Sequence, residues 1–152
     1  MSQTAVVAGV TGKLADSETR KIAGGAAALA IVLGTIDAFV GSNGGIVVAA
    51  IVALVVGVTT AGVFLLAVPW ALSLEEPGAS VVAVLSSLLG LLTVVIFWSG
   101  VPPVLAAGGI VLGRSQADAE QGRFYARAAV VLGIAVIVLD VIRVLADVIT
   151  NL

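Results

Sequence analysis

Residues 79–113 read ASVVAVLSSLLGLLTVVIFWSGVPPVLAAGGIVLG, and this stretch decides how the chain folds. It lies within a run of 37 residues between Glu76 and Arg114 that carries no charged side chain. An uncharged apolar stretch of about 18 residues is typical of one membrane-spanning helix, so the run is long enough for more than one. The segment SGVPP at 99–103 interrupts the run, because proline has no N–H and disfavours helix in the residue before it. The break predicts that a new helix begins at Pro102 or Pro103, since proline suits the first helical turn.

The composition of the whole chain has the same character. Of its 152 residues, 61% are hydrophobic and 11% are charged, and a second run of 37 uncharged residues separates Asp37 from Glu75. A soluble domain carries roughly a quarter of its residues as charged side chains. These numbers exclude a soluble domain, a disordered protein and a nucleic-acid binder. The net charge of −2 argues against a basic face for phosphates or anionic lipid.

The apolar segments and their breaks predict an all-α integral membrane helical bundle. We expect four full transmembrane helices at about 22–40, 46–70, 79–98 and 128–149, and a short fifth helix at about 102–113. The fifth helix, led by proline, would be only about 18 Å long against a hydrocarbon core of roughly 30 Å. Residues 1–21 form a polar N-terminal segment, and 22–152 form a single transmembrane bundle.

Basic residues outside the spans indicate the topology. They form two clusters of three, namely Lys13, Arg20 and Lys21, then Arg114, Arg123 and Arg127. Cytoplasmic loops are enriched in Lys and Arg, which favours both clusters on the cytoplasmic side of a cell or virion membrane. That arrangement requires residues 79–113 to cross twice, or to enter and turn back, and we favour such a hairpin. A single kinked crossing stays open, because it would divide the basic residues equally and the rule would decide nothing.

Small residues predict one helix-packing face. Ala49, Ala53, Gly57 and Ala61 recur at four-residue spacing in the second span. Membrane helices associate through close packing of such residues, because lipid tails are as apolar as leucine. The partner helix could belong to the same chain or to another subunit.

Charged residues within predicted spans are the candidate functional groups. They are Asp37, Asp140, Arg143 and Asp147, and the last three share one helical face. Charges inside a membrane are costly and are functional candidates by default. Asp37 and Arg143 have equal calculated depths, about 24 Å along their helices from Lys21 and Arg127. We therefore hypothesise that they pair, which requires the first and last helices to be parallel.

Four short motifs carry a resemblance to a known group of proteins. They are SGVPP at 99–103, IVLGR at 110–114, GR at 122–123 and VLG at 131–133. With them, residues 84–141 resemble small, uncharacterised, actinobacterial-type polytopic membrane proteins. The resemblance implies a multi-pass helical fold and lends no activity or site residue. The loop at 114–127 is more acidic here than in that group.

The absence of catalytic residue types predicts a non-enzymatic protein without cofactor or metal. The chain has no Cys and no His, which removes thiol nucleophiles, imidazole bases and the commonest transition-metal ligands. We expect a structural, scaffold or accessory subunit of a membrane assembly. Its partners would be the lipid bilayer and other membrane helices, in a homo-oligomer or a larger complex, and not nucleic acid. One version is the internal membrane protein of an enveloped virus of a halophile, which the acidic, Lys-poor composition permits. The alternative is a small oligomeric transporter or channel that uses Asp37 or Asp140.

Overall fold

The computed structural model describes residues 17–40, 45–75, 77–96, 101–118 and 122–151, and the regular structure in these ranges is entirely helical. The helices are α2 (Ser17–Val40), α3 (Gly45–Ala61), η1 (Gly62–Ala67), α4 (Val68–Leu72), α5 (Gly78–Ile96), α6 (Val101–Ser115) and α7 (Arg123–Asn151). The predicted all-α class is confirmed, and each predicted span has a helix in its place. Helices α2 and α7 begin five residues earlier than predicted, at Ser17 and Arg123.

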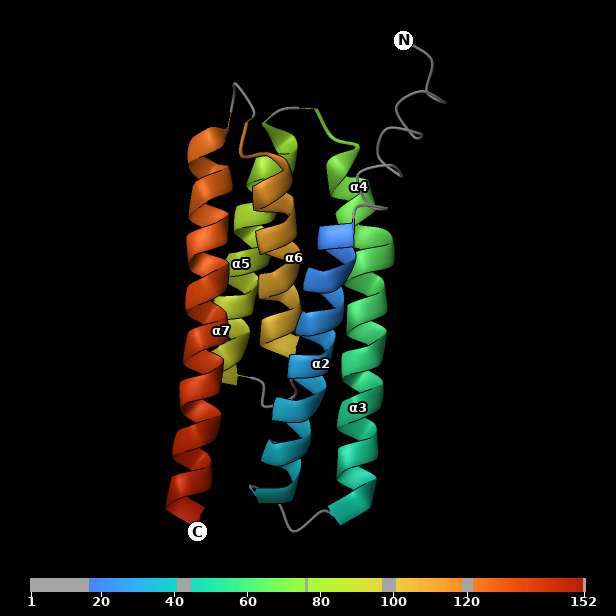
Figure 1. Ribbon diagram of the computed structural model, residues 1–152, viewed down its shortest axis with the longest axis vertical. Helices are drawn as coiled ribbons and strands as arrows, with labels where there is room; N and C mark the ends of the chain where they lie inside the picture. Colours follow the sequence, from blue (N-terminus) through green and yellow to red (C-terminus); the bar gives the residue numbers. More distant parts are fainter. Residues whose placement is uncertain (1–16, 41–44, 76, 97–100, 119–121, 152) are drawn as a thin grey trace.

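The helices lie side by side along the long axis of the molecule (Figure 1). Helix α2 runs toward one end of the bundle, and α3, η1 and α4 return as one rod. Helix α5 then runs in the direction of α2, α6 runs back beside it, and α7 spans the full length of the bundle. Helices α2 and α7 are therefore parallel, as the favoured topology requires.

Within residues 79–113, α5 and α6 are two antiparallel helices rather than one kinked helix (Figure 1). Helix α5 ends and α6 begins partway along α7, inside the length of the bundle (Figure 1). Pro102 and Pro103 stand in the first turn of α6, as predicted. Both are fully buried. Because proline has no N–H, these two residues remove two of the donors that a helix beginning inside the protein would leave without an acceptor.

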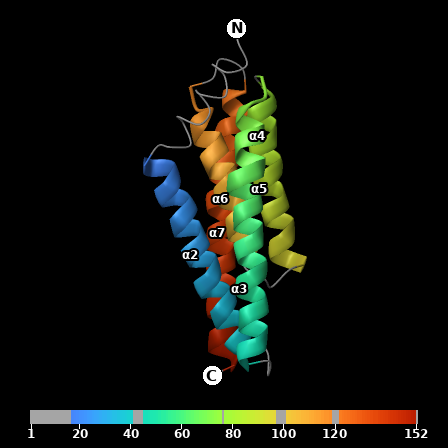
Figure 2. The same cartoon turned by 90° about the vertical axis from the view of Figure 1, so that its right-hand side faces the viewer.

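Helix α6 is the centre of the bundle. It contacts every other helical segment of the described chain. It lies between α7 and the rod of α3 and α4 in Figure 1, and between α2 and α5 in Figure 2. Every residue from Pro102 to Gly113 is buried except the half-buried Leu105. A 15-residue helix that is apolar all round is stable when neighbours cover all of its faces, and this one has such neighbours.

The second span continues as a helix past Pro69 because a π-helical segment precedes this proline. Pro69 cannot donate to the carbonyl four residues earlier, and its ring would crowd that carbonyl in a regular α-helix. The preceding segment η1 is a π-helix, in which the Val68 N–H bonds to the Val63 carbonyl five residues back. The helix consequently continues to Leu72, slightly beyond the predicted end at about residue 70.

The prediction of four full transmembrane helices is not supported. In the described residues, only Ile46–Leu72 and Arg123–Thr150 are long and apolar enough to cross a membrane. The apolar parts of α2 and α5 are Gly24–Ile36 and Gly78–Val94. At 1.5 Å per residue they measure about 20 and 26 Å, less than the roughly 30 Å of a hydrocarbon core. The predicted bounds of these two spans also include residues whose side chains lie outside the described part of the chain.

Candidate functional site

Three charged residues of α7 face the interior or its edge in the second half of that helix. Asp140 continues a buried stripe of α7 that includes Ala129, Gly133 and Val136, and its exposed fraction is only 6%. The side chains of Arg143 and Asp147 are 31% and 44% exposed. The burial of these three side chains therefore decreases toward the end of the helix.

Hydrogen bonding connects this charged group to the end of α5. Arg143 Nη1 donates to the Val94 carbonyl at 3.1 Å, and Arg143 Nε lies 3.9 Å from Asp147 Oδ2. The last carbonyls of a helix have no partner within it and carry partial negative charge, so a cation there is favourable. Arg143 consequently stabilises the end of α5 within the length of the bundle.

The beginning of α6 lies close to the same level of α7. A methyl group added at Gly90 of α5 would lie 3.2 Å from the Pro102 carbonyl oxygen and 3.5 Å from Val136 Cγ1. Val136 precedes Asp140 by about one helical turn. The buried side chain of Asp140 therefore lies at about the same height along the bundle as the end of α5 and the beginning of α6. The sequence analysis identified this residue, but it did not associate the residue with the helix break.

The predicted pairing of Asp37 with Arg143 stays a prediction. Asp37 belongs to α2, but its side chain lies outside the described residues. The parallel course of α2 and α7 satisfies the requirement that the hypothesis set (Figure 1).

The small-residue face of the second span divides into two halves. Ala49 and Ala53 are half-buried, whereas Gly57 and Ala61 are exposed. A methyl group on Gly57 would meet nothing within 4 Å. The predicted contact at this second half would need a partner outside the described chain, and it stays a prediction.

Close helix packing occurs instead around α6. A methyl group on Gly109 would collide with Ser87 Oγ and would lie 2.9 Å from the Ala83 carbonyl oxygen. On Gly133 it would lie 2.8 Å from the Ala106 carbonyl oxygen. Sequence reasoning gave these glycines no more weight than many others, because spacing alone does not tell which glycine faces a neighbouring backbone.

Two serines of α5 join three helices. Ser86 Oγ donates to the Leu105 carbonyl of α6, and Ser87 Oγ donates to the Ala129 carbonyl of α7, both at 2.9 Å. Serine hydroxyls that bond across helices satisfy their own polarity in an apolar interior. Two adjacent polar side chains among apolar neighbours are the sequence signal that could have predicted these contacts.

The described residues contain no group of three or more acidic side chains that could hold a metal ion. They define a class of protein only coarsely, as an all-helical chain with two helices long and apolar enough to cross a membrane. No protein-family model, curated protein or solved structure matches the chain.

Proposed function

We propose that the protein is a small, non-enzymatic integral membrane protein that serves as a structural or accessory subunit of a membrane assembly. The observation that carries the membrane location is the exposure of its two long apolar helices. Only 11% of the apolar window of Ile46–Leu72 is buried, and only 28% of that of Arg123–Thr150. A core helix of a soluble protein would be mostly buried, because exposed apolar surface costs about 25 cal/mol per Å² in water.

The distribution of side-chain size supports the same proposal. Buried positions are dominated by small residues, among them Ala30, Ala83, Ala107 and Ala129. The exposed surface carries large aliphatic side chains such as Ile46, which is 80% exposed. Membrane helices pack through small residues and direct large apolar ones to lipid.

The proposed position in the bilayer follows from α7. The 20 residue steps from Arg127 to Asp147 extend about 30 Å, which matches one hydrocarbon core. We place the N-terminal segment and residues 114–127 on the cytoplasmic side. On this proposal the rod of α3 and α4 and helix α7 cross the membrane by their long apolar stretches. Helix α2, whose apolar part is shorter than the hydrocarbon core, crosses by its whole length of 24 residues, about 36 Å. Helices α5 and α6 enter from the cytoplasmic side and return to it.

The packed centre favours a structural role over transport. Helix α6 is buried along nearly all its length, and its glycines approach neighbouring backbones closely. A water-filled path through the bundle would separate these contacts. The competing function is an ion or proton pathway, and the burial of Asp140 is the observation that favours it.

Three experiments test the proposal. First, the expressed protein should stay in the membrane pellet after alkaline carbonate washing, and its release into the supernatant would refute integral insertion. Second, the protein reconstituted in vesicles should show no proton or sodium flux above that of empty vesicles. Flux that is lost in Asp140→Asn but kept in Asp147→Asn would replace the structural proposal with the transport one. Purification from native membranes should recover a stoichiometric membrane partner or a homo-oligomer.

A further inference from the structure

The first two turns of α7 carry arginines and aromatic rings together on an exposed surface. Arg123, Phe124, Tyr125 and Arg127 are all exposed, with Phe124 at 79% and Tyr125 at 47%. The two rings meet edge to face with centroids 5.9 Å apart. We call these four residues the α7 cap.

The backbone beneath the α7 cap is held by packing. Ala126 lies between the cap residues in sequence and is fully buried. Its N–H bonds to the Gly122 carbonyl at 2.9 Å, and a methyl group on Gly113 of α6 would lie 2.6 Å from the Ala126 carbonyl oxygen. The cap side chains therefore project from a fixed helix end rather than from a loop.

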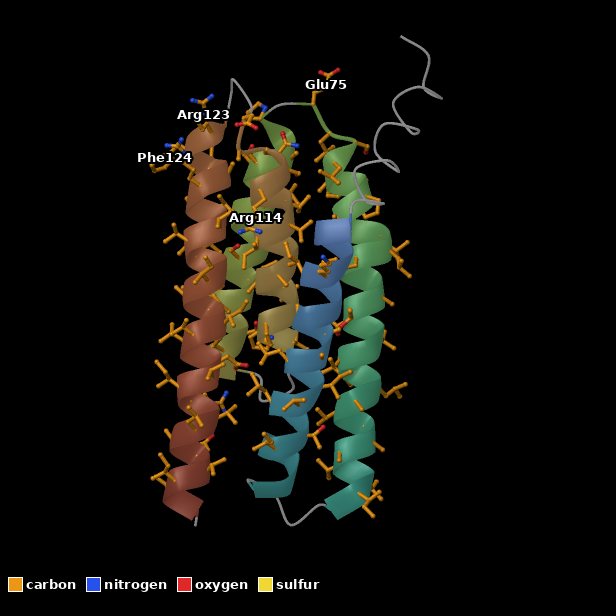
Figure 3. The ribbon with its side chains drawn as sticks, viewed as in Figure 1. Glu75, Arg114, Arg123 and Phe124 are labelled. Carbon is orange, nitrogen blue, oxygen red and sulfur yellow. The ribbon has the colours of Figure 1, made fainter. Side chains whose placement is uncertain are left out.

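The arginines of the cap have no acidic partner within the described part of the chain. The ion pair found there joins Arg143 to Asp147, in the other half of α7. Figure 3 shows Arg123 at the end of α7 with its side chain directed away from the bundle, and Glu75 apart from it over the region between α4 and α5. Phe124 points outward from the same end, away from the other helices. Positive charge at this surface is thus available to an external anion.

We propose that the α7 cap binds the phosphate of an anionic phospholipid headgroup, an inference that rests on the proposed membrane location. Guanidinium groups bind phosphate through two parallel hydrogen bonds, and lysine cannot reproduce this geometry. Exposed aromatic rings occupy the boundary between headgroups and acyl chains. The cap begins the helix at the boundary of the proposed 30 Å span, so its arginines stand at headgroup depth. The net charge of −2 is a sum over the whole chain and does not report this local cluster of arginines. For that reason the composition argued against a basic face for anionic lipid.

The test measures lipid retention by the purified protein in a non-ionic detergent. Phosphatidylglycerol and phosphatidylcholine are titrated separately, and bound lipid is counted by native mass spectrometry. We expect phosphatidylglycerol to bind at least several-fold more tightly. Arg127→Gln should weaken that binding roughly fivefold, which is the fold-change that corresponds to about 1 kcal/mol for one basic residue at an anionic membrane surface. Arg127→Lys should recover only part of the loss.

Lys21→Gln is the matched control, because Lys21 is an exposed basic residue on α2. The proposal expects a much smaller loss in Lys21→Gln than in Arg127→Gln. Equal losses would reveal diffuse charge attraction and overturn the proposal, as would equal affinity for the two lipids in the wild type. Millimolar inorganic phosphate should not displace the lipid, and displacement would assign the cap to free phosphate instead. Unchanged helical circular dichroism will show that all three variants fold.

The same preparation separates this proposal from the proposed function. If the wild-type protein inserts into pure phosphatidylcholine vesicles and resists carbonate extraction but shows no lipid preference, only the proposal that the α7 cap binds anionic lipid is refuted. Protein that fails to insert into vesicles of either lipid refutes the membrane location, and the α7 cap proposal falls with it.

Discussion

The contact between Gly109 and Ser87 offers the sharpest test of the packing around α6. In Gly109→Ala the new methyl group would collide with Ser87 Oγ and would also lie 3.1 Å from the Ser87 backbone nitrogen and 2.9 Å from the Ala83 carbonyl oxygen. Because two of these atoms are backbone, a side-chain rotation cannot relieve the crowding. Helices α5 and α6 must separate, and the hydrogen bond from Ser87 to Ala129 is strained with them.

The magnitude follows from three contributions. Overpacking of a close contact costs about 1–3 kcal/mol. Weakening of an interhelical hydrogen bond in a membrane protein costs roughly 0.6 kcal/mol more. The intrinsic preference of helices for alanine over glycine opposes these costs by about 1 kcal/mol. We therefore expect Gly109→Ala to lower the free energy of unfolding by about 0.6–2.6 kcal/mol.

Gly57→Ala is the matched control, since it makes the same substitution where nothing lies within 4 Å. It retains only the propensity contribution, so its stability should be unchanged or higher by up to about 1 kcal/mol. The assay is reversible unfolding of the detergent-solubilised protein in sodium dodecyl sulfate, followed by helical circular dichroism. If Gly109→Ala is as stable as Gly57→Ala, the close approach of α5 and α6 is wrong.

Three further predictions use the same unfolding assay. Ser87→Ala should lower the stability by about 0.6–1.7 kcal/mol because it removes a hydrogen bond between helices. Thr35→Ala is the control and should lower the stability less, because the Thr35 hydroxyl bonds within its own helix. A larger loss in Thr35→Ala than in Ser87→Ala would contradict the hydrogen bond between α5 and α7. Arg143→Met should lower the stability by about 1–3 kcal/mol, because it removes the charged hydrogen bond to the Val94 carbonyl of α5. Arg143→Lys should recover part of this loss. If Arg143→Met is as stable as the wild type, Arg143 does not stabilise the end of α5. Gly133→Ala should be destabilising by up to about 2 kcal/mol, because overpacking costs about 1–3 kcal/mol and the helix preference for alanine returns about 1 kcal/mol. Its methyl group would lie 2.6 Å from Ile110 Cγ1 and 2.8 Å from a backbone carbonyl oxygen. A variant as stable as Gly57→Ala would refute the packing of α6 on α7.

Local chemistry was sufficient to locate the helices. Their ends follow from glycine-rich breaks, charged connections and proline, all of which act on the residues next to them. Several ends differ from prediction, and two of them show the physical reason. Helix α7 begins at Arg123, five residues before the predicted start, because charged and aromatic residues are compatible with helix even though they do not belong to an apolar span. The π-helix before Pro69 likewise lets a helix pass a residue that ordinarily ends it.

Packing residues were predictable only as a set of candidates. The chain contains 18 glycines, and their spacing suggests many possible faces. The face with the most regular spacing includes Gly57, which has open space around it, while Gly109 and Gly133 touch neighbouring backbones. Regular spacing describes one helix, whereas close approach depends on where a second helix lies.

The amino-acid sequence was enough for the helical class, the approximate helix ends and the break in residues 79–113, because these depend on composition and on neighbours along the chain. The tertiary structure alone decided that the two parts of this stretch run antiparallel, and that α6 is covered by every other helical segment described. It also decided that Asp140 is buried beside the break and that the α7 cap is exposed. The physical reason is that burial and charge pairing are properties of contacts between segments distant in sequence, which no local pattern contains.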